Sequence, residues 1–468
     1  MQRPSIEQDR IDLTSSSHKQ QERWQIEQLF DRLFPICRSI TGPGLRQSLD
    51  ILSEWMPLEH FSVASGTRLF DWEVPKEWRI RSATLTDPQG RVIADFDTHN
   101  LHVLNYSIPV DGYFTLDELK SHLYTNPVLP NSIPYVTSYY KERWGFCLTQ
   151  DIYDQLKPGR YHAHIDSELV EGEMNYAHAI LPGECEEEIL ISSYLCHPSM
   201  ANNELSGPIT AAMLYQRLSR WQKRRFTYRF VFAPETIGSI AYLHQFGKGL
   251  KARMHAGMIL TCLGGQEPLS YKQSRQGHSP LDLLWHHLFA SEASPNRTRP
   301  FTPNYGSDER QYNSPGFNLP VGQISRMLHA SFPEYHSSAD TKEVMTMDAL
   351  VKSADEIEHL LLGLELDGYY VNQSPYGEVK LDRYGLYPDM NQNGILRQSN
   401  NQLVDGRKQL NRILTILNYA DGQHNLQEIA EKCQSHGNIY DLQPVIHLLI
   451  EKGLLKGPYS NRMEPFEI

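Results

Sequence analysis

The chain has 468 residues, 40% of them hydrophobic and 21% charged, which suits two to four ordinary globular domains. Its formal net charge of −12 argues against a nucleic-acid surface spread over the whole molecule. No apolar run approaches the ~20 residues that span a bilayer, and the start lacks the apolar core of a signal peptide. We therefore expect a cytoplasmic protein that does not enter the membrane.

The cysteines are scattered, without the close pairs of a zinc ribbon or the density of a disulfide scaffold. We expect reduced and mostly buried thiols at Cys37, Cys147, Cys185, Cys196, Cys262 and Cys433.

The first third of the chain changes character twice. Residues 1–21 are polar and rich in Ser, Gln and Asp, which predicts a disordered arm. Helical spacing of apolar residues follows, and Thr41-Gly42-Pro43 is typical of a helix start. Residues 22–70 are assigned to the main domain. Residues 71–165 contain short β-like runs punctuated by proline and glycine, which predict a small inserted β-rich domain.

Residues 166–385 alternate near-continuous apolar runs with helical stretches, which predicts an α/β domain with a sheet covered on both faces. One apolar run ends just before His197, a second before Glu235 and a third at Thr261; a fourth precedes the segment of His336. Open α/β sheets bind ligands at the carboxyl ends of their strands. These polar residues are therefore expected to share one functional cleft.

The tail, residues 394–468, predicts three short helices and a strand-like end, an arrangement that resembles a winged helix. From residue 395 onward, eight Lys and Arg oppose eight Asp and Glu. Because DNA-binding modules concentrate positive charge, the balance favours a packing role, a protein partner or a homo-oligomer contact over nucleic acid.

Each candidate residue has two interpretations. His197 could bind zinc, or it could be a strand-end histidine satisfied by backbone. Glu235 could act as general base and then acid, or cap the next helix. His336 could be a second ligand or a surface loop residue, and Asn203, expected in a loop, could simply form an Asx-turn or helix cap. The recurrence of such residues at strand ends favours the functional interpretations.

Three long strings, at residues 70–78, 133–140 and 306–312, together with the segments of His197, Glu235 and His336, resemble one family. The chain is similar, from about residue 22 to its end, to the aminopeptidase-like proteins of the zinc exopeptidase superfamily. Its branch carries an inserted β-rich domain and a C-terminal winged helix. Bacterial leucyl aminopeptidases and glutaminyl cyclases are relatives. The resemblance implies a mixed sheet flanked by helices.

By this resemblance, His197 and His336 match the first and last histidine ligands, and Glu235 matches the catalytic glutamate. Asn203 stands where the aminopeptidases have the aspartate that bridges two zinc ions. Thr236 and Thr261 replace two further metal-binding carboxylates. Since neutral oxygens bind zinc less tightly than carboxylates, we expect at most one zinc ion, weakly held by His197, Asn203 and His336.

The leading hypothesis is a zinc-dependent hydrolase of peptide or amide bonds, with an aminopeptidase as the family-level interpretation. Its substrate would be a small peptide, an aminoacyl compound or another amide, and Asp308, Arg310 and Asp340 are the residues expected to hold it; each could equally form a loop salt bridge. Two alternatives stay open. One is a catalytically impaired pseudoenzyme that binds a ligand in the same cleft, and the other is an amide-forming or cyclising enzyme on this scaffold.

Overall fold

The computed structural model describes residues 16–289, 297–327, 331–387, 397–399, 402–404, 406–433, 438–464 and 466. The chain divides into two compact units. The first comprises Met1–Asp282 and Pro295–Glu356, and the second comprises Leu283–Ser294 and Ile357–Ile468.

The first unit is built on an eight-stranded mixed sheet in the order β1-β10-β12-β11-β13-β16-β14-β15. Its strands are β1 (Glu59–Ala64), β10 (Glu173–Leu181), β11 (Glu188–Tyr194), β12 (Thr227–Ala233), β13 (Met254–Leu260), β14 (Ser270–Lys272), β15 (Arg297–Arg299) and β16 (Val321–Ser325). The neighbours β12, β11, β13 and β16 are parallel, whereas β10 runs antiparallel to β1 and β12, and β14 runs antiparallel to β16 but parallel to β15. Every residue of β11 and β16 is buried, which requires cover on both faces. The sheet confirms the predicted α/β class.

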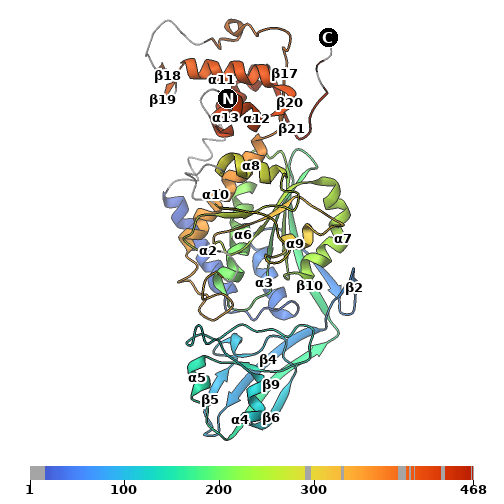
Figure 1. Cartoon of the computed structure of the whole chain (residues 1–468), viewed down its shortest axis with the longest axis vertical. Helices are drawn as coiled ribbons and strands as arrows, with labels where there is room; N and C mark the ends of the chain where they lie inside the picture. Colours follow the sequence, from blue (N-terminus) through green and yellow to red (C-terminus); the bar gives the residue numbers. More distant parts are fainter. Residues whose placement is uncertain are drawn as a thin grey trace. The chain divides into compact units, whose positions relative to one another are not determined.

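Helices surround this sheet (Figure 1). Those that lie wholly in the first unit are α2 (Ser16–Leu33), α3 (Pro43–Ser53), α6 (Ser206–Ser219), α7 (Ile237–Arg253) and α9 (Glu309–Tyr312), whereas α8 (Pro280–Phe289) and α10 (Met347–Leu366) each begin in the first unit and end in the second. Residues 1–15 of the expected disordered arm lie outside the described residues, but its remainder begins α2. The prediction of disorder was wrong there because Lys19 pairs with Asp355 at 2.8 Å and Glu22 with Arg217 at 2.6 Å, which fixes α2 on the domain.

The middle of the chain forms a separate four-stranded antiparallel sheet, with β4 and β9 at its centre (Figure 1). Its strands are β4 (Glu77–Thr86), β5 (Val92–Asp95), β6 (Val110–Thr115) and β9 (Arg160–Val170). Short elements complete this region: β2 (Arg68–Leu69), β3 (Trp72–Glu73), β7 (Leu123–Tyr124), β8 (Phe146–Cys147), α4 (Leu116–Leu119) and α5 (Gln150–Asp154). Leu85, Phe146 and Tyr161 belong to its own buried cluster. The long β9 runs on to Val170, five residues past the boundary that the sequence pattern indicated at 165.

The second unit contains three helices and a three-stranded antiparallel sheet in the order β20-β17-β21. They are α11 (Gly406–Tyr419), α12 (Leu426–Lys432), α13 (Ile439–Glu451), β17 (Tyr369–Asn372), β20 (Asp421–Asn425) and β21 (Leu455–Tyr459), and a further pair is β18 (Arg397–Ser399) with β19 (Gln402–Val404). The expected helices of the tail are present. Because β17 joins their sheet, this unit draws on residues well before the expected start at 394.

Among the described residues, no helix combines the length and apolarity that a membrane crossing requires. The six cysteines are free thiols, four of them buried, as the sequence predicted.

Candidate functional site

His197 lies at the carboxyl edge of the central sheet, three residues after β11, and is 5% exposed. Its Nδ1 is 2.8 Å from Oε2 of Glu204, and its Nε2 is 3.8 Å from Oε2 of Glu235. A carboxylate on Nδ1 fixes the ring and its tautomer. The Nε2 atom is therefore the one presented to Glu235 and to any ligand between them.

Glu204 was missed by the sequence reasoning, which concentrated on its neighbour Asn203. The carboxylate is fully buried and lies 3.5 Å from Nε of the buried Arg38, which also donates to the backbone oxygen of His197 at 2.9 Å. Arg38 thus compensates the buried charge and holds the backbone of the histidine. An acidic residue seven positions after a candidate ligand histidine was the available signal.

The charge on His197 is set by these neighbours. Burial by itself lowers the pKa of the imidazole, but Cys196 and Glu204 outweigh it and hold the pKa well above its ordinary range. Binding of a metal ion at Nε2 would therefore release a proton.

Glu235 follows β12 by two residues, and its side chain is 27% exposed. Oε1 accepts a hydrogen bond from the Ser307 hydroxyl at 2.6 Å, and the backbone N–H donates to Sγ of Cys196 at 3.3 Å. The next residue, Thr236, has φ of 65°, a left-handed conformation that a β-branched residue rarely adopts. The strained turn points an accessible carboxylate at His197 instead of burying it.

His336 lies in a loop after β16, far from His197 in the sequence. The ring centroids of the two histidines are nevertheless 5.4 Å apart. Its φ of 56° is also left-handed. Tyr335 stacks on the ring at 4.0 Å, and Tyr135 meets it edge-on at 5.3 Å. The structure thus brings His197, Glu235 and His336 together, as the strand-end pattern indicated.

Asn203 lies in a π-helical turn, Ala201–Leu205, that leads directly into α6, and not in the loop expected from its sequence. The turn forms because Asp340 accepts the backbone N–H groups of Asn202 and Asn203, both at 2.8 Å. The Asn203 amide nitrogen is buried without a hydrogen-bond partner, and its Oδ1 is 3.5 Å from the Tyr194 hydroxyl.

Tyr194 links two of the positions at which the zinc aminopeptidases have carboxylates. Its buried hydroxyl donates to the backbone oxygen of Asn203 and lies 2.6 Å from Oγ1 of Thr261. Burial raises the pKa of this hydroxyl well above its ordinary value, so it stays neutral. Asn203, Tyr194 and Thr261, the neutral cluster, form the uncharged side of the site.

The three residues expected to hold a substrate contact the loops that carry the site residues. Asp340 is fully buried beneath the turn of Asn203, and burial raises its pKa to about 7. Asp308 is 1% exposed and accepts from the Thr236 N–H at 2.7 Å; burial and then the Glu235 charge raise its pKa to about 8. Arg310 donates to the backbone oxygen of Ser307 at 3.1 Å. The described contacts of these residues hold loops together, because buried backbone donors need acceptors, and their expected contact with a substrate stays a prediction.

Two donor sets could hold a metal ion. Cys196, His197 and Glu204 lie within 4.8 Å of one another. However, burial raises the pKa of the Cys196 thiol to about 11, and Glu204 already serves His197 and Arg38. The better set is Nε2 of His197 with His336 and Glu235, since two imidazoles and a carboxylate suit zinc.

The ring separation supports one shared ion. Two imidazole nitrogens each ~2.0–2.1 Å from a tetrahedral zinc ion put the ring centroids about 5 Å apart, and His197 and His336 are 5.4 Å apart. The Asn203 amide adds a test, since its O and N are interchangeable in shape. If the two amide atoms are exchanged, the nitrogen lies 3.5 Å from the Tyr194 hydroxyl, which can accept from it. The oxygen then takes the position in which the nitrogen has no hydrogen-bond partner. Among the described residues, His336 does not bring a ring nitrogen within 4.8 Å of both Nε2 of His197 and the Glu235 carboxylate, so a shared zinc ion would require the His336 side chain to move.

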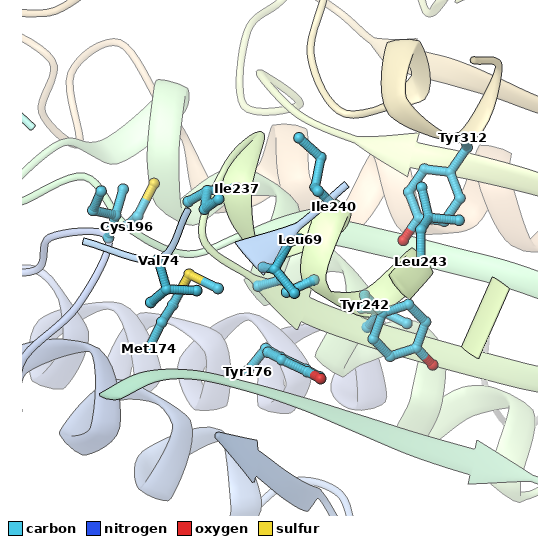
Figure 2. Close-up of a cluster of buried hydrophobic side chains, with 14 of the residues drawn as sticks. Leu69, Val74, Met174, Tyr176, Cys196, Ile237, Ile240, Tyr242, Leu243 and Tyr312 are labelled. Atoms are coloured by element: carbon cyan, nitrogen blue, oxygen red, sulfur yellow. The ribbon is translucent and has the colours of Figure 1, made fainter. Parts of the chain in front are cut away.

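The site rests on a hydrophobic cluster that immobilises its strands. Figure 2 shows Cys196, beside His197, near Ile237, which opens α7, with Tyr242 and Tyr312 further along the cluster. Cys196, Tyr242 and Tyr312 are at most 1% exposed. Such packing holds His197 and Glu235 in place before any ligand arrives.

Comparison with known proteins shows where this fold and site belong. Residues 27–367 match the family described as "Domain of unknown function (DUF4910)", and residues 368–457 match a winged helix-turn-helix. A Clostridium acetobutylicum protein named "Putative polysaccharide biosynthesis protein with aminopeptidase-like domain" is 40% identical over 87% of this chain and 91% of its own length.

Solved structures agree. A "putative peptidase" from Clostridium acetobutylicum is 37% identical over 94% of this chain and 97% of its own, with a TM-score of 0.83. A zinc aminopeptidase from Bacillus subtilis is 12% identical over 74% of this chain and 95% of its own, with a TM-score of 0.54, which confirms the expected zinc-exopeptidase fold. The chain therefore belongs to the DUF4910 family, an aminopeptidase-like domain with the fold of the zinc aminopeptidases, followed by a winged helix-turn-helix.

Proposed function

We propose that the chain is an aminopeptidase-like hydrolase of amide bonds that works with a single zinc ion. The observation that carries the proposal is the orientation of His197: Glu204 on Nδ1 turns Nε2 toward Glu235 at 3.8 Å, with the His336 ring 5.4 Å away. A strand-end histidine satisfied by backbone would not need a buried carboxylate and a buried guanidinium behind it. The identity of the relatives as peptidase-like proteins supports the same reaction class.

His197 and His336 would hold the ion, with Asn203 as a weak neutral ligand, and Glu235 would lie beside it as the base. The ion would supply a Lewis acid for the scissile carbonyl. Glu235 accepts the proton of the attacking water at Oε2 and returns it to the leaving nitrogen. Ser307, on Oε1, keeps that carboxylate oriented between the two transfers.

A panel of aminoacyl anilides tests this function on untagged protein with and without added zinc. We expect amine release that requires zinc, and a fall of about 10²–10⁴-fold in Glu235→Gln. Glu171→Gln is the control, since Glu171 is 76% exposed and carries only a long ion pair with Lys76. Equal turnover in Glu235→Gln and wild type would refute the assignment.

The pseudoenzyme alternative has an observation in its favour, because the neutral cluster replaces carboxylates that a two-zinc site needs. It predicts no turnover in either condition alongside saturable binding of an amide ligand. An amide-forming or cyclising enzyme would likewise release no amine from the anilides, but would consume a peptide with an N-terminal glutamine.

We also infer that the winged helix contacts protein and not nucleic acid. In DNA-binding relatives of this motif, the start of the recognition helix enters the major groove. Here α13 has no Lys or Arg, and Tyr440 in its first turn stacks on His359 of α10 at 3.9 Å within the same compact unit. Fluorescence anisotropy with duplex DNA in 50 mM salt checks this; we expect no saturable binding, and tight salt-dependent binding would overturn it.

A further inference from the structure

The segment 133–139 comes from the middle of the chain, between β7 and β8, but lies along the loop of His336. The Tyr135 N–H donates to the His336 backbone oxygen at 2.8 Å, and the Ser338 N–H donates to the Ile133 oxygen at 2.8 Å. The Ile133 N–H donates in return to Oγ of Ser338 at 2.9 Å. This region is therefore attached to the candidate site by its backbone.

Tyr135 reaches both candidate ligand histidines. Its ring centroid is 5.2 Å from that of His197 and 5.3 Å from that of His336, with an angle of 89° to the latter. The side chain is 9% exposed. Its ring therefore lies beside both imidazoles, although it comes from the inserted region and not from the central sheet.

The Tyr135 hydroxyl is paired with a second hydroxyl from the same segment. The two oxygens of Tyr135 and Tyr139 are 2.5 Å apart. Burial, and next its neighbouring hydroxyl, raises the pKa of Tyr135; burial, and next Cys196, raises that of Tyr139, where Glu235 contributes in the same direction. Both hydroxyls are therefore protonated at neutral pH.

Two protonated hydroxyls that share one hydrogen bond leave one O–H to donate elsewhere. Among the residues that the structure describes, neither hydroxyl has a second hydrogen-bond partner. Tyr135 is buried and Tyr139 is partly buried, and a donor that a neighbouring hydroxyl polarises is a strong one. An acceptor on a bound ligand would complete the hydrogen bonding of this pair.

We propose that the second O–H of the Tyr135–Tyr139 pair donates to an acyl oxygen of the bound ligand. The inserted region thereby supplies a hydrogen-bond donor to the site. The inference rests on the proposed function for the position of the ligand, between Glu235 and the two histidines. It restricts the ligand class to acyl compounds, namely amides or the carboxylates formed from them, and it gives the donor the role of stabilising negative charge on that oxygen.

Calorimetric titration of the zinc-loaded full chain with two small probes tests the proposal. Acetohydroxamate offers a carbonyl oxygen, whereas ethanethiol binds zinc without any oxygen. The variants are Tyr135→Phe, Tyr139→Phe, both together, and Tyr140→Phe as a control, because Tyr140 adjoins the pair but is 55% exposed.

One of the two hydroxyls donates within the pair, and the other donates to the ligand. The single variant that removes the hydroxyl that donates to the ligand should weaken acetohydroxamate binding by about tenfold. The other single variant should lose less, because it removes only a polarising neighbour, and the double variant should be no worse than the stronger single one. Ethanethiol affinity and the Tyr140→Phe control should match wild type.

Three results would overturn the inference: wild-type affinity for acetohydroxamate in both single variants, an equal loss for ethanethiol, or no binding of acetohydroxamate by wild type. Hydrolysis of aminoacyl anilides is measured in parallel. Absent turnover with the predicted probe selectivity would refute the hydrolase proposal and support the tyrosine pair.

Discussion

The two sides of the candidate site handle burial in opposite ways. On one side, the buried carboxylate of Glu204 has ionisable partners, His197 at 2.8 Å and Arg38 at 3.5 Å. On the other side, Asn203, Tyr194 and Thr261 form the uncharged neutral cluster. The first arrangement prepares an imidazole for a cation, whereas the second offers a cation only weak dipoles.

If the proposed one-zinc function holds, this difference would let an aminopeptidase fold keep one metal position and lose another. Two zinc ions bring four positive charges, which need carboxylates nearby. Residues 203, 236 and 261 are neutral, and among the described ion pairs the carboxylate that faces Nε2 of His197 is that of Glu235. In the neutral cluster the Tyr194 hydroxyl bridges Asn203 and Thr261, but the Asn203 amide nitrogen has no hydrogen-bond partner.

The largest effect is expected on the charged side. Glu204→Gln leaves Arg38 buried without its anion and should lower the free energy of unfolding by about 3–5 kcal/mol. It also removes the acceptor on Nδ1 of His197, so zinc affinity should fall about 10–100-fold. Denaturant unfolding and zinc titration measure the two effects, and wild-type values in both would show that the charged side is not specialised.

The neutral side should respond differently to a change of similar size. Tyr194→Phe removes one hydroxyl and leaves buried acceptors, at a cost of about 1–3 kcal/mol in unfolding free energy. Zinc affinity should stay near that of wild type, because the hydroxyl contacts Asn203 and Thr261 and not the histidines. A tenfold loss of zinc affinity in this variant would make Tyr194 part of the metal site.

Asn203→Asp converts one neutral position back to an anion. Zinc binding should tighten by about tenfold, the change that ~1.4 kcal/mol of charge attraction produces. Without zinc the variant should be less stable than wild type, because a buried carboxylate there would lack a counterion. Calorimetric titration checks the affinity; unchanged binding would show that residue 203 does not face the metal position.

A smaller effect is expected at Glu77, a buried carboxylate outside the site that also has guanidinium partners. Its Oε1 is 2.8 Å from Arg46 and 2.9 Å from Arg79. Burial opposes ionisation, but these partners lower the pKa from 4.5 to about 2. A carboxyl group with a depressed pKa contributes stability above pH 4.5, and this contribution is lost as the pH falls toward 2. The free energy of unfolding of the wild type should therefore fall more steeply over that pH range than that of Glu77→Gln. Parallel pH profiles would contradict this.

The sequence predicted the strands and their polar ends because apolar runs and the residues that follow them are local features. It also predicted the three tail helices. The partners of His197 were harder to predict from the sequence. Arg38 lies 159 positions from His197 and is brought to it by tertiary packing, and Glu204 lies seven positions from it. The π-helical turn of Asn203 depends on Asp340, 137 residues away. The tyrosine pair was contained in a recognised string, but nothing local indicates that segment 133–139 reaches His336.

Calorimetric zinc titration of the untagged full chain, followed by dialysis against a mild chelator, tests the one-metal site most directly. One zinc ion per chain should bind, should be lost on dialysis, and should fail to bind in His197→Ala. Two ions per chain, zinc retained stoichiometrically after dialysis, or wild-type binding in His197→Ala would contradict it.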